Sequence, residues 1–287
     1  MLSNNREKNN REKWQVELEE LRQEWNLSWE GDPMETPTSI IIFARYKNQP
    51  AALKISNSAS EHTSAVLKHY NGYGAARILK NRGRITLMKR CVPGVSLKDL
   101  TLNNEDEKAT HILCDVIEKL HSNVEFEGNY RFTHEFTQFF DHYLNSGDKQ
   151  IPTKLIEKAS AIFADLKDSK EKQILLHGDL HHENIIYDQK QGWLAIDPKG
   201  FVGEACYEVG AFLRNPIDSE ICLSHNIIKR RIDIICTRLG YDKLRVLSLA
   251  FAQSILAAVQ FIEDGYKYEN ALQVAKNLEA QELHLRV

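Results

Sequence analysis

The segment His177–Asn184 and the aspartate at position 197 place polar side chains at a spacing that suits chemistry. Asp179 is followed five residues later by Asn184, and a predicted strand–turn–strand segment over 184–196 leads from Asn184 to Asp197. Phosphoryl transfer needs a carboxylate that orients the attacking hydroxyl and oxygen ligands that hold Mg²⁺ on the phosphates. Because a hairpin returns the chain to its start, Asp197 should face the same metal as Asn184. The pattern predicts Asp179 as the catalytic residue and Asn184 and Asp197 as magnesium ligands.

The abundance of histidine in this segment allows a second interpretation, a zinc-dependent hydrolase site. The residues concerned are His177, Asp179, His181 and His182. A metallo-hydrolase motif of this kind would need His and Asp in the opposite order, and it would leave Asn184 and Asp197 without a role. We therefore favour the magnesium site, with His177 bracing the loop through hydrogen bonds.

A lysine within an apolar strand is the next candidate. Lys54 lies between apolar neighbours over 51–55, where an ammonium group must find a carboxylate or water. Glu61, in the first turn of the following predicted helix, is the predicted partner, and such a pair would hold the phosphates of ATP. The alternative is a solvated lysine on an edge strand, and the neighbouring Asp179 motif favours the phosphate-binding role.

The end of the strand over 85–90 is predicted to meet the adenine ring. Backbone groups of Met88, Lys89 and Arg90 precede Val-Pro-Gly at 92–94, which indicates a connection between two lobes. An ordinary strand that leaves a sheet would show the same pattern, so both interpretations stay open.

Acidic residues beyond Asp197 suggest a cationic substrate. Besides Asp179, the candidate substrate-binding residues are Glu204, Glu208, Glu263 and Asp264. The alternative for each is a solvated helix face or cap.

The elements predicted around these residues form a two-lobed α+β fold. Strands are expected over 39–46, 51–55, 76–80 and 85–89, with a helix after the second strand. Helices are expected around 112–120, 132–143 and 155–163 and over roughly 217–239, 242–264 and 268–284, with strands of this half only near 184–196. We expect a helix that packs on the body at 1–28, an ATP-binding lobe at 29–90 and a helical lobe with the catalytic loop at 91–287.

Bulk properties limit the partners and the compartment. The net charge of −3 argues against a nucleic-acid binder, and five cysteines without a C-x-x-C pair argue against a disulfide framework. The polar N-terminus does not resemble a signal peptide, and the apolar runs are short for a membrane span. We expect a cytoplasmic protein that acts on a small molecule, without a membrane or nucleic-acid partner.

A family resemblance adds to this interpretation. His177–Asn184, together with Leu-Ala-Ile-Asp-Pro-Lys-Gly-Phe-Val-Gly-Glu at 194–204, resembles the streptomycin 6-kinase and hydroxyurea phosphotransferase branch of the aminoglycoside phosphotransferases. Weaker similarities lie at 25–27, 72–79 and 93–97. The resemblance implies a protein-kinase-like fold, ATP with magnesium, and phosphate transfer to a small-molecule hydroxyl. It places Asp179 at the catalytic aspartate, Asn184 and Asp197 at the metal ligands, and Lys54 at the phosphate lysine.

The chain departs from that pattern in three places. No G-x-G-x-x-G precedes Lys54, so the segment 36–39 would have to cover the phosphates; Glu183 replaces a frequent Gly, and Glu208 replaces a frequent Asp. Only ten residues, 198–207, separate Asp197 from Glu208, which leaves no space for the activation segment of a protein kinase. The acceptor stays open among streptomycin, hydroxyurea, another aminocyclitol and a different metabolite. A nucleotide-binding module without turnover is the non-enzymatic alternative.

Overall fold

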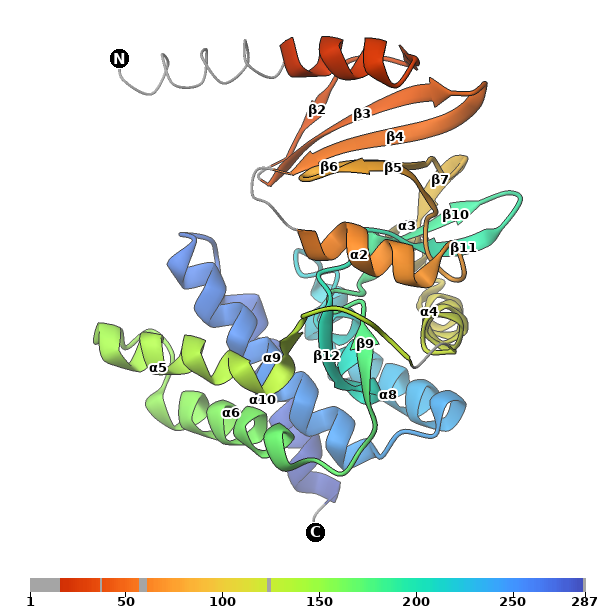
Figure 1. The fold of residues 1–287 in the computed structure, drawn as a ribbon. Helices are drawn as coiled ribbons and strands as arrows, with labels where there is room; N and C mark the ends of the chain where they lie inside the picture. Colours follow the sequence, from red (N-terminus) through yellow and green to blue (C-terminus); the bar gives the residue numbers. More distant parts are fainter. Residues whose placement is uncertain (1–15, 37, 57–60, 123–124, 286–287) are drawn as a thin grey trace.

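The computed structural model describes residues 16–285 except 37, 57–60 and 123–124. It consists of a smaller lobe built on one antiparallel sheet and a larger lobe that is mostly helical (Figure 1). The predicted α+β architecture with two lobes is confirmed.

The sheet of the N-terminal lobe has the strand order β1-β3-β4-β6-β5, with β2 paired to β3. The β3–β4 hairpin turns at Lys47 and Asn48, whose φ angles of 50° and 61° are those of a two-residue hairpin turn. The strands are β1 (Leu27–Trp29), β2 (Met34–Glu35), β3 (Ser39–Tyr46), β4 (Gln49–Ser56), β5 (Ile78–Arg82) and β6 (Ile85–Lys89).

Each face of this sheet is covered by a helix. The helix at 16–24 packs on the outer face, where Leu18, Leu21 and Trp25 join the apolar side chains of β3, β4 and β6. Helix α2 (Glu61–Tyr70) lies between the sheet and the helical lobe (Figure 1). Because α2 buries Val66 and Leu67 in the core of the C-terminal lobe, it ties the two lobes together.

The C-terminal lobe is built around α9, whose side chains from Leu249 to Val259 are almost all buried. Among the described helices, α9 alone has the length and hydropathy of a membrane span, and 72% of that apolar window is buried inside the protein, as in the core helix of a globular lobe. The helices are α3 (Leu97–Leu102), α4 (Asp106–Leu120), α5 (Thr137–Ser146), α6 (Thr153–Asp165), α7 (Gly210–Leu213), α8 (His225–Leu239), α9 (Lys243–Glu263) and α10 (Glu269–Leu285).

Two three-stranded sheets in this lobe carry the catalytic segment. One has the order β11-β10-β7, and the other has the order β8-β12-β9. Their strands are β7 (Pro93–Ser96), β8 (Arg131–Phe132), β9 (Gln173–Leu176), β10 (Ile185–Asp188), β11 (Gly192–Ala195) and β12 (Phe201–Glu204). The predicted hairpin over 184–196 is present, and the loop that contains Asp179 runs from β9 to β10.

Three sequence expectations for this lobe were wrong. Strands β7, β8, β9 and β12 lie outside 184–196; they have two to four residues, too few to show a period. The segment at 91–94, expected to be a plain linker, enters strand β7, which pairs with β10. The helix expected from 217 begins at His225, because Ser224 caps its N-terminus, and a separate 3₁₀ turn occupies Glu220–Leu223.

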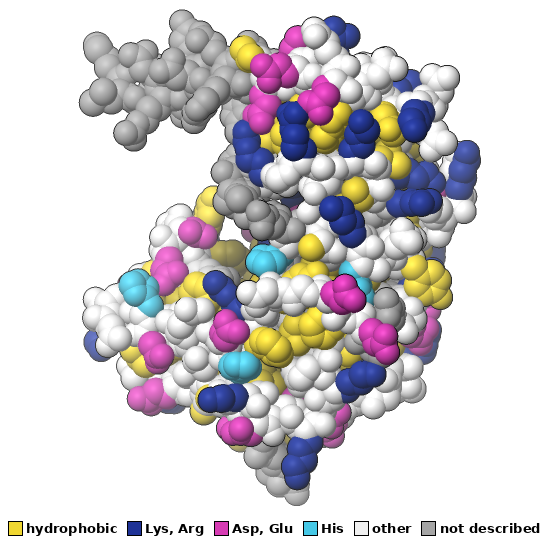
Figure 2. Space-filling view, in the orientation of Figure 1, with side chains coloured by type: hydrophobic (Ala, Val, Ile, Leu, Met, Phe, Trp, Pro, Cys, Tyr) yellow, Lys and Arg dark blue, Asp and Glu magenta, His cyan; other side chains and the backbone are white. Residues whose placement is uncertain are grey.

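The surface differs between the lobes. In Figure 2, Lys and Arg side chains gather on the N-terminal lobe, while acidic and basic side chains are mixed on the helical lobe. The same view shows a hollow between the lobes. Residues from both lobes, such as Lys54 and Asn184, line one cavity of the structure.

Candidate active site

The catalytic loop leaves β9 through a sharp turn at Gly178. This residue has a φ of 81°, and a Cβ atom built on it would lie 2.4 Å from the ring of Phe201. Only glycine fits both the backbone conformation and the contact. The turn brings Asp179 out of the core to the surface of the lobe.

Asp179 lies at the edge of a small cavity of about 220 Å³, with a quarter of its side chain exposed. Its carboxylate has two loose neighbours: Arg214 Nη2 lies 3.9 Å from one oxygen, and His181 Nε2 lies 4.0 Å from the other. Neither contact is a hydrogen bond at that distance. The carboxylate is therefore held near positive charge but has hydrogen-bonding capacity left for a ligand.

Asn184 is oriented by its amide nitrogen. Nδ2 donates to the backbone oxygen of Asp179 at 2.9 Å and lies 3.2 Å from Nε2 of His181. No described residue donates to its Oδ1. Since an amide oxygen is a good ligand for a hard cation, this orientation suits the predicted metal role.

Asp197 is brought to Lys54 from 143 residues away, and the two side chains form a short ion pair. Asp197 has a φ of 58°, a conformation that costs energy for a residue with a Cβ and is often found at functional sites. Burial raises the pKa of its carboxyl, but Lys54, Lys199 and His177 together lower it more, so the net shift is downward. Lys54 therefore has Asp197 as its partner, whereas Glu61 begins α2 with a side chain outside the described part of the structure.

Lys54, Asn184 and Asp197 share a cavity of about 460 Å³ between the lobes. Met88, Lys89 and Arg90 also line this cavity, where the adenine site is predicted. The other lining residues are mostly apolar: Met34, Ile41, Phe43, Ala52, Cys91, Pro93, Gly94, Ile186 and Ile196. An apolar slot that ends in a cation and two oxygen ligands can hold a planar base with its phosphates.

The backbone near Arg90 limits how the hinge can meet a base. The N–H of Lys89 donates to Arg77 O at 2.8 Å, and that of Arg90 donates to Pro50 O at 3.2 Å. These two N–H groups are therefore already used within the protein and are not free to donate to a base. The guanidinium of Arg90 also stacks on Phe43, 3.6 Å from the ring centre, and forms part of the cavity wall.

The segment expected to cover the phosphates forms the tight turn from β2 to β3. The N–H of Thr36 donates to Ser39 O at 2.8 Å; Pro37 lies outside the described residues.

Glu208 supports the catalytic loop from behind. Its fully buried carboxylate accepts the N–H of His177 at 2.7 Å and that of Gly178 at 2.8 Å, and it lies 3.3 Å from His121 Nε2. Burial raises the pKa of Glu208, but the contact with His121 and the backbone hydrogen bonds outweigh it and lower the pKa overall. Glu208 was predicted to attract substrate, but both oxygens of its carboxylate accept hydrogen bonds from the catalytic loop.

His177 binds the loop to the hairpin, since its Nε2 lies 2.8 Å from the carbonyl of Ile196. This is the bracing contact expected for His177.

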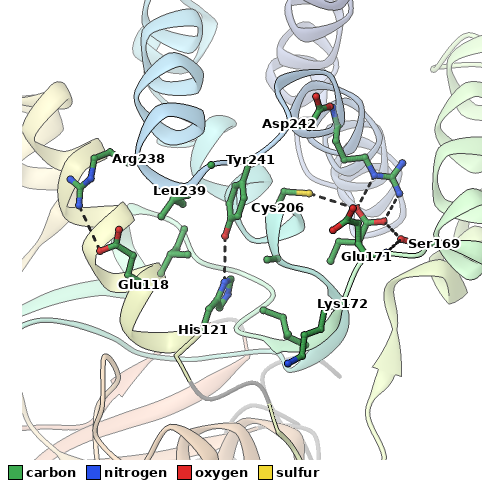
Figure 3. Close-up of a pocket in the computed structure, with 16 residues that line it drawn as sticks. Glu118, His121, Ser169, Glu171, Lys172, Cys206, Arg238, Leu239, Tyr241 and Asp242 are labelled. Carbon is green, nitrogen blue, oxygen red and sulfur yellow. Dashed lines mark hydrogen bonds and ion pairs between the residues drawn. The ribbon is translucent and has the colours of Figure 1, made fainter.

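Glu204 lies on the far side of this support, in the wall of a larger cavity of about 850 Å³ (Figure 3). Its buried carboxylate accepts two hydrogen bonds from Arg245, at 2.8 and 2.5 Å, and one from Ser169 at 2.5 Å. In the same wall Tyr241 points to His121, with 3.4 Å between its hydroxyl and Nδ1. Glu204 therefore forms an ion pair with Arg245, and it lines a different cavity from the one beside Asp179.

The remaining acidic candidates are at the end of α9. Glu263 and Asp264 are exposed, and neither lines the cavity beside Asp179. Three cations line that cavity instead, Lys199 from the loop before β12 and the unexpected Arg131 and Arg214. No local motif marks the two arginines, because each reaches the cavity only through the packing of β8 and α7 on the loop.

Comparison with known proteins agrees with this geometry. The chain matches the family profile described as aminoglycoside/hydroxyurea antibiotic resistance kinase over residues 24–265. It is 28% identical over 246 residues to streptomycin 3''-kinase of Klebsiella pneumoniae, covering 84% of this chain and 91% of the relative. It is 23% identical over 259 residues to hydroxyurea phosphotransferase of Kitasatospora aureofaciens, covering 86% and 72%.

Solved structures show the same fold. A thermostable mutant of aminoglycoside phosphotransferase APH(4)-Ia, in a ternary complex with ADP and hygromycin B, superimposes with a TM-score of 0.65 and 14% identity, over 91% of this chain and 96% of the other. Choline kinase LicA from Streptococcus pneumoniae gives a TM-score of 0.63 at 14% identity, over 94% and 99%. The fold is thus that of kinases that phosphorylate small molecules. The chain belongs to the aminoglycoside/hydroxyurea antibiotic resistance kinase family, whose members are ATP-dependent phosphotransferases that act on hydroxyl groups.

Proposed function

We propose that this protein transfers the γ-phosphate of ATP directly to a hydroxyl of a small molecule, with Asp179 as the catalytic residue. The observation that supports this most is the position of Asp179 relative to two cavities. Lys54, Asn184 and Asp197 line the cavity between the lobes, and Asp179 opens on the other. A donor and an acceptor can therefore approach the catalytic loop from two sides.

In this mechanism Asp179 orients the acceptor hydroxyl and accepts its proton as the oxygen attacks the γ-phosphorus. The bond from phosphorus to the ADP oxygen breaks as the new bond forms, and no phosphoenzyme is required. Lys54 holds the phosphates of ATP, and Arg214 places a positive charge 3.9 Å from the carboxylate of Asp179.

Magnesium fits the oxygen donors present. Asn184 presents Oδ1 and Asp197 a carboxylate with a lowered pKa, and both are ligands that Mg²⁺ prefers. These two residues would hold the ion, which would neutralise charge on the phosphates.

Two acceptor types follow from the names of the relatives. One is an aminoglycoside of the streptomycin type, and the other is a hydroxyurea-type compound. A role in antibiotic resistance and a cytoplasmic location, where ATP is abundant, belong to the same proposal.

The experiment is ADP release with ATP and magnesium, with and without streptomycin or hydroxyurea, on wild type and Asp179→Ala. Release that an acceptor stimulates and that Asp179→Ala abolishes, with ATP affinity nearly intact, would support the assignment. Activity retained in Asp179→Ala would overturn it. A nucleotide-binding module without turnover would bind ATP and release no ADP with any acceptor.

A further inference from the structure

The support behind the catalytic loop extends beyond Glu208 to two further side chains. The imidazole of His121 lies against this carboxylate, with 3.3 Å between Nε2 and Oε2, and on its other side the hydroxyl of Tyr241 lies 3.4 Å from Nδ1. His121 directly follows α4, and Tyr241 lies between α8 and α9 (Figure 3). Three segments that are far apart in the sequence therefore meet behind the loop.

The hydrogen bonds along this path have a defined direction. Glu208, whose pKa is lowered overall, is a carboxylate that can only accept, so Nε2 of His121 must carry the hydrogen that faces it. In the neutral imidazole Nδ1 is then an acceptor. Burial raises the pKa of the Tyr241 hydroxyl, which therefore keeps its hydrogen and can donate to Nδ1. Tyr241 thus favours the tautomer of His121 that donates to Glu208.

Glu208 transmits this orientation to the loop. Its two oxygens accept the N–H groups of His177 and Gly178 at 2.7 and 2.8 Å, directly before Asp179 in the chain. The side chain of Glu208 is 0% exposed and that of His121 is 10% exposed. His121 lines the cavity of about 850 Å³ and Glu208 does not, so the imidazole lies between the carboxylate and that cavity. Loss of the imidazole would open the carboxylate to water and remove one of its donors.

We infer that His121 and Tyr241 are positioning residues, which act on Asp179 through Glu208 and the backbone of the catalytic loop. The inference rests on the proposed function, because the group that they position is the proposed catalytic carboxylate. Neither side chain lines the cavity between the lobes or the cavity beside Asp179. A change in either should therefore lower kcat and leave the binding of ATP nearly intact.

A matched pair of substitutions at His121 tests this role. The amide nitrogen of His121→Gln extends about as far as Nε2 and can donate to Glu208, whereas that of His121→Asn ends near the position of Nδ1. The assay is magnesium- and ATP-dependent ADP release with streptomycin or hydroxyurea as acceptor. In His121→Asn, kcat should fall at least about tenfold with the KM for ATP within about twofold of wild type, and His121→Gln should keep kcat within about threefold.

His111→Asn is the control for the substitution itself. It makes the same change on α4, where the imidazole contacts Arg238 in place of Glu208, and its kcat should match that of wild type. Equal losses in His121→Asn and His121→Gln would assign the effect to packing and overturn the inference. Wild-type kcat in His121→Asn would overturn it as well.

Tyr241→Phe tests the tautomer, because it removes the hydroxyl and keeps the ring. In the wild-type background it should lower kcat about threefold, whereas in His121→Gln it should have no further effect, since an amide has no tautomer to select. This variant stays informative if His121→Asn folds poorly. Equal losses in the two backgrounds would overturn the role of Tyr241.

Amide hydrogen exchange keeps the inference distinct from the proposed function. Exchange in the peptide 173–184, followed by mass spectrometry, reports on the N–H groups of His177 and Gly178 whether or not the protein turns over. It should be faster in His121→Asn and unchanged in His121→Gln and His111→Asn, and unchanged exchange in His121→Asn would overturn the inference. No ADP release from wild type with either acceptor, together with faster exchange in His121→Asn, would reject the kinase and keep the coupling of His121 to the loop.

Discussion

The catalytic loop has two sides that differ in how completely their charges are paired. On the front, Asp179 is a quarter exposed, and its nearest partners are the guanidinium of Arg214 at 3.9 Å and the imidazole of His181 at 4.0 Å. On the back, Glu208 is fully buried and accepts two backbone N–H groups at 2.7 and 2.8 Å beside His121. The carboxylate of Glu208 is satisfied within the protein and holds the loop, whereas Asp179 keeps hydrogen-bonding capacity that a ligand can use. Two acidic residues 29 positions apart in one sequence thus serve opposite purposes.

The largest expected effect is a loss of activity in Asp179→Asn, on the front of the loop. The amide keeps the shape but cannot accept a proton, so kcat should fall about 10³-fold or more. The midpoint of thermal unfolding should stay within a few degrees of wild type, because Asp179 makes no tight contact. Activity assays and calorimetry check both, and a large loss of stability would show that the front is structural as well.

Glu208→Gln should disrupt the hydrogen bonds that support the catalytic loop from behind. An amide can accept at its oxygen alone, so one of the two backbone N–H groups would face another donor in the core. The free energy of unfolding should fall by about 2–4 kcal/mol, measured by denaturant titration. Glu171→Gln, an exposed change on the same lobe, is the control and should stay near wild type. Full stability in Glu208→Gln would contradict the role assigned to this carboxylate.

Gly178→Ala tests the turn that joins the two sides. The added Cβ would meet Phe201 at 2.4 Å at a φ of 81°, so the loop must shift. A displacement of Asp179 by about 1 Å is expected to lower kcat about a hundredfold. Gly192→Ala has a similar φ of 79° and no atom within 4 Å, so it controls for backbone strain alone. Equal activity of the two variants would show that the contact with Phe201 does not position the loop.

The smallest effect is a pH dependence of stability. The pKa of Glu208 is lowered in the folded protein from its ordinary value of 4.5, so its charged form stabilises the fold. This contribution is complete above the unfolded value and is lost as pH falls through the folded pKa. The stability difference between wild type and Glu208→Gln should therefore be constant from pH 7 to about 5 and shrink below about 4.5. Unfolding titrations along this range measure it, and a difference that grows toward acid would reverse the sign.

Part of this organisation was predictable from neighbours in the chain. The spacing of Asp179, Asn184 and Asp197 predicted a loop and a hairpin, which the structure contains, and the lobes followed from alternating strands and amphipathic helices. The roles of these residues stay predictions. The four-residue strands β9 and β12 could not be predicted, because runs of that length show no period.

The partners of the charged side chains could not be predicted from neighbouring residues in the chain. The sequence predicted Glu204 and Glu208 as substrate-binding residues. In the structure Glu204 pairs with Arg245, 41 residues away, and Glu208 accepts loop N–H groups that lie 30 and 31 residues away. Whether a carboxylate faces a cavity or the core depends on what packs over it.

The sequence by itself determined the family, the two-lobed fold and the motif with Asp179, because these follow from residue types at short separation. Tertiary structure decided which face each acidic residue serves and which cations surround Asp179. The physical reason is that electrostatic pairing depends on distance in space and burial, and packing brings Lys54 to Asp197 across 143 residues while it turns Glu208 away from the cavity beside Asp179.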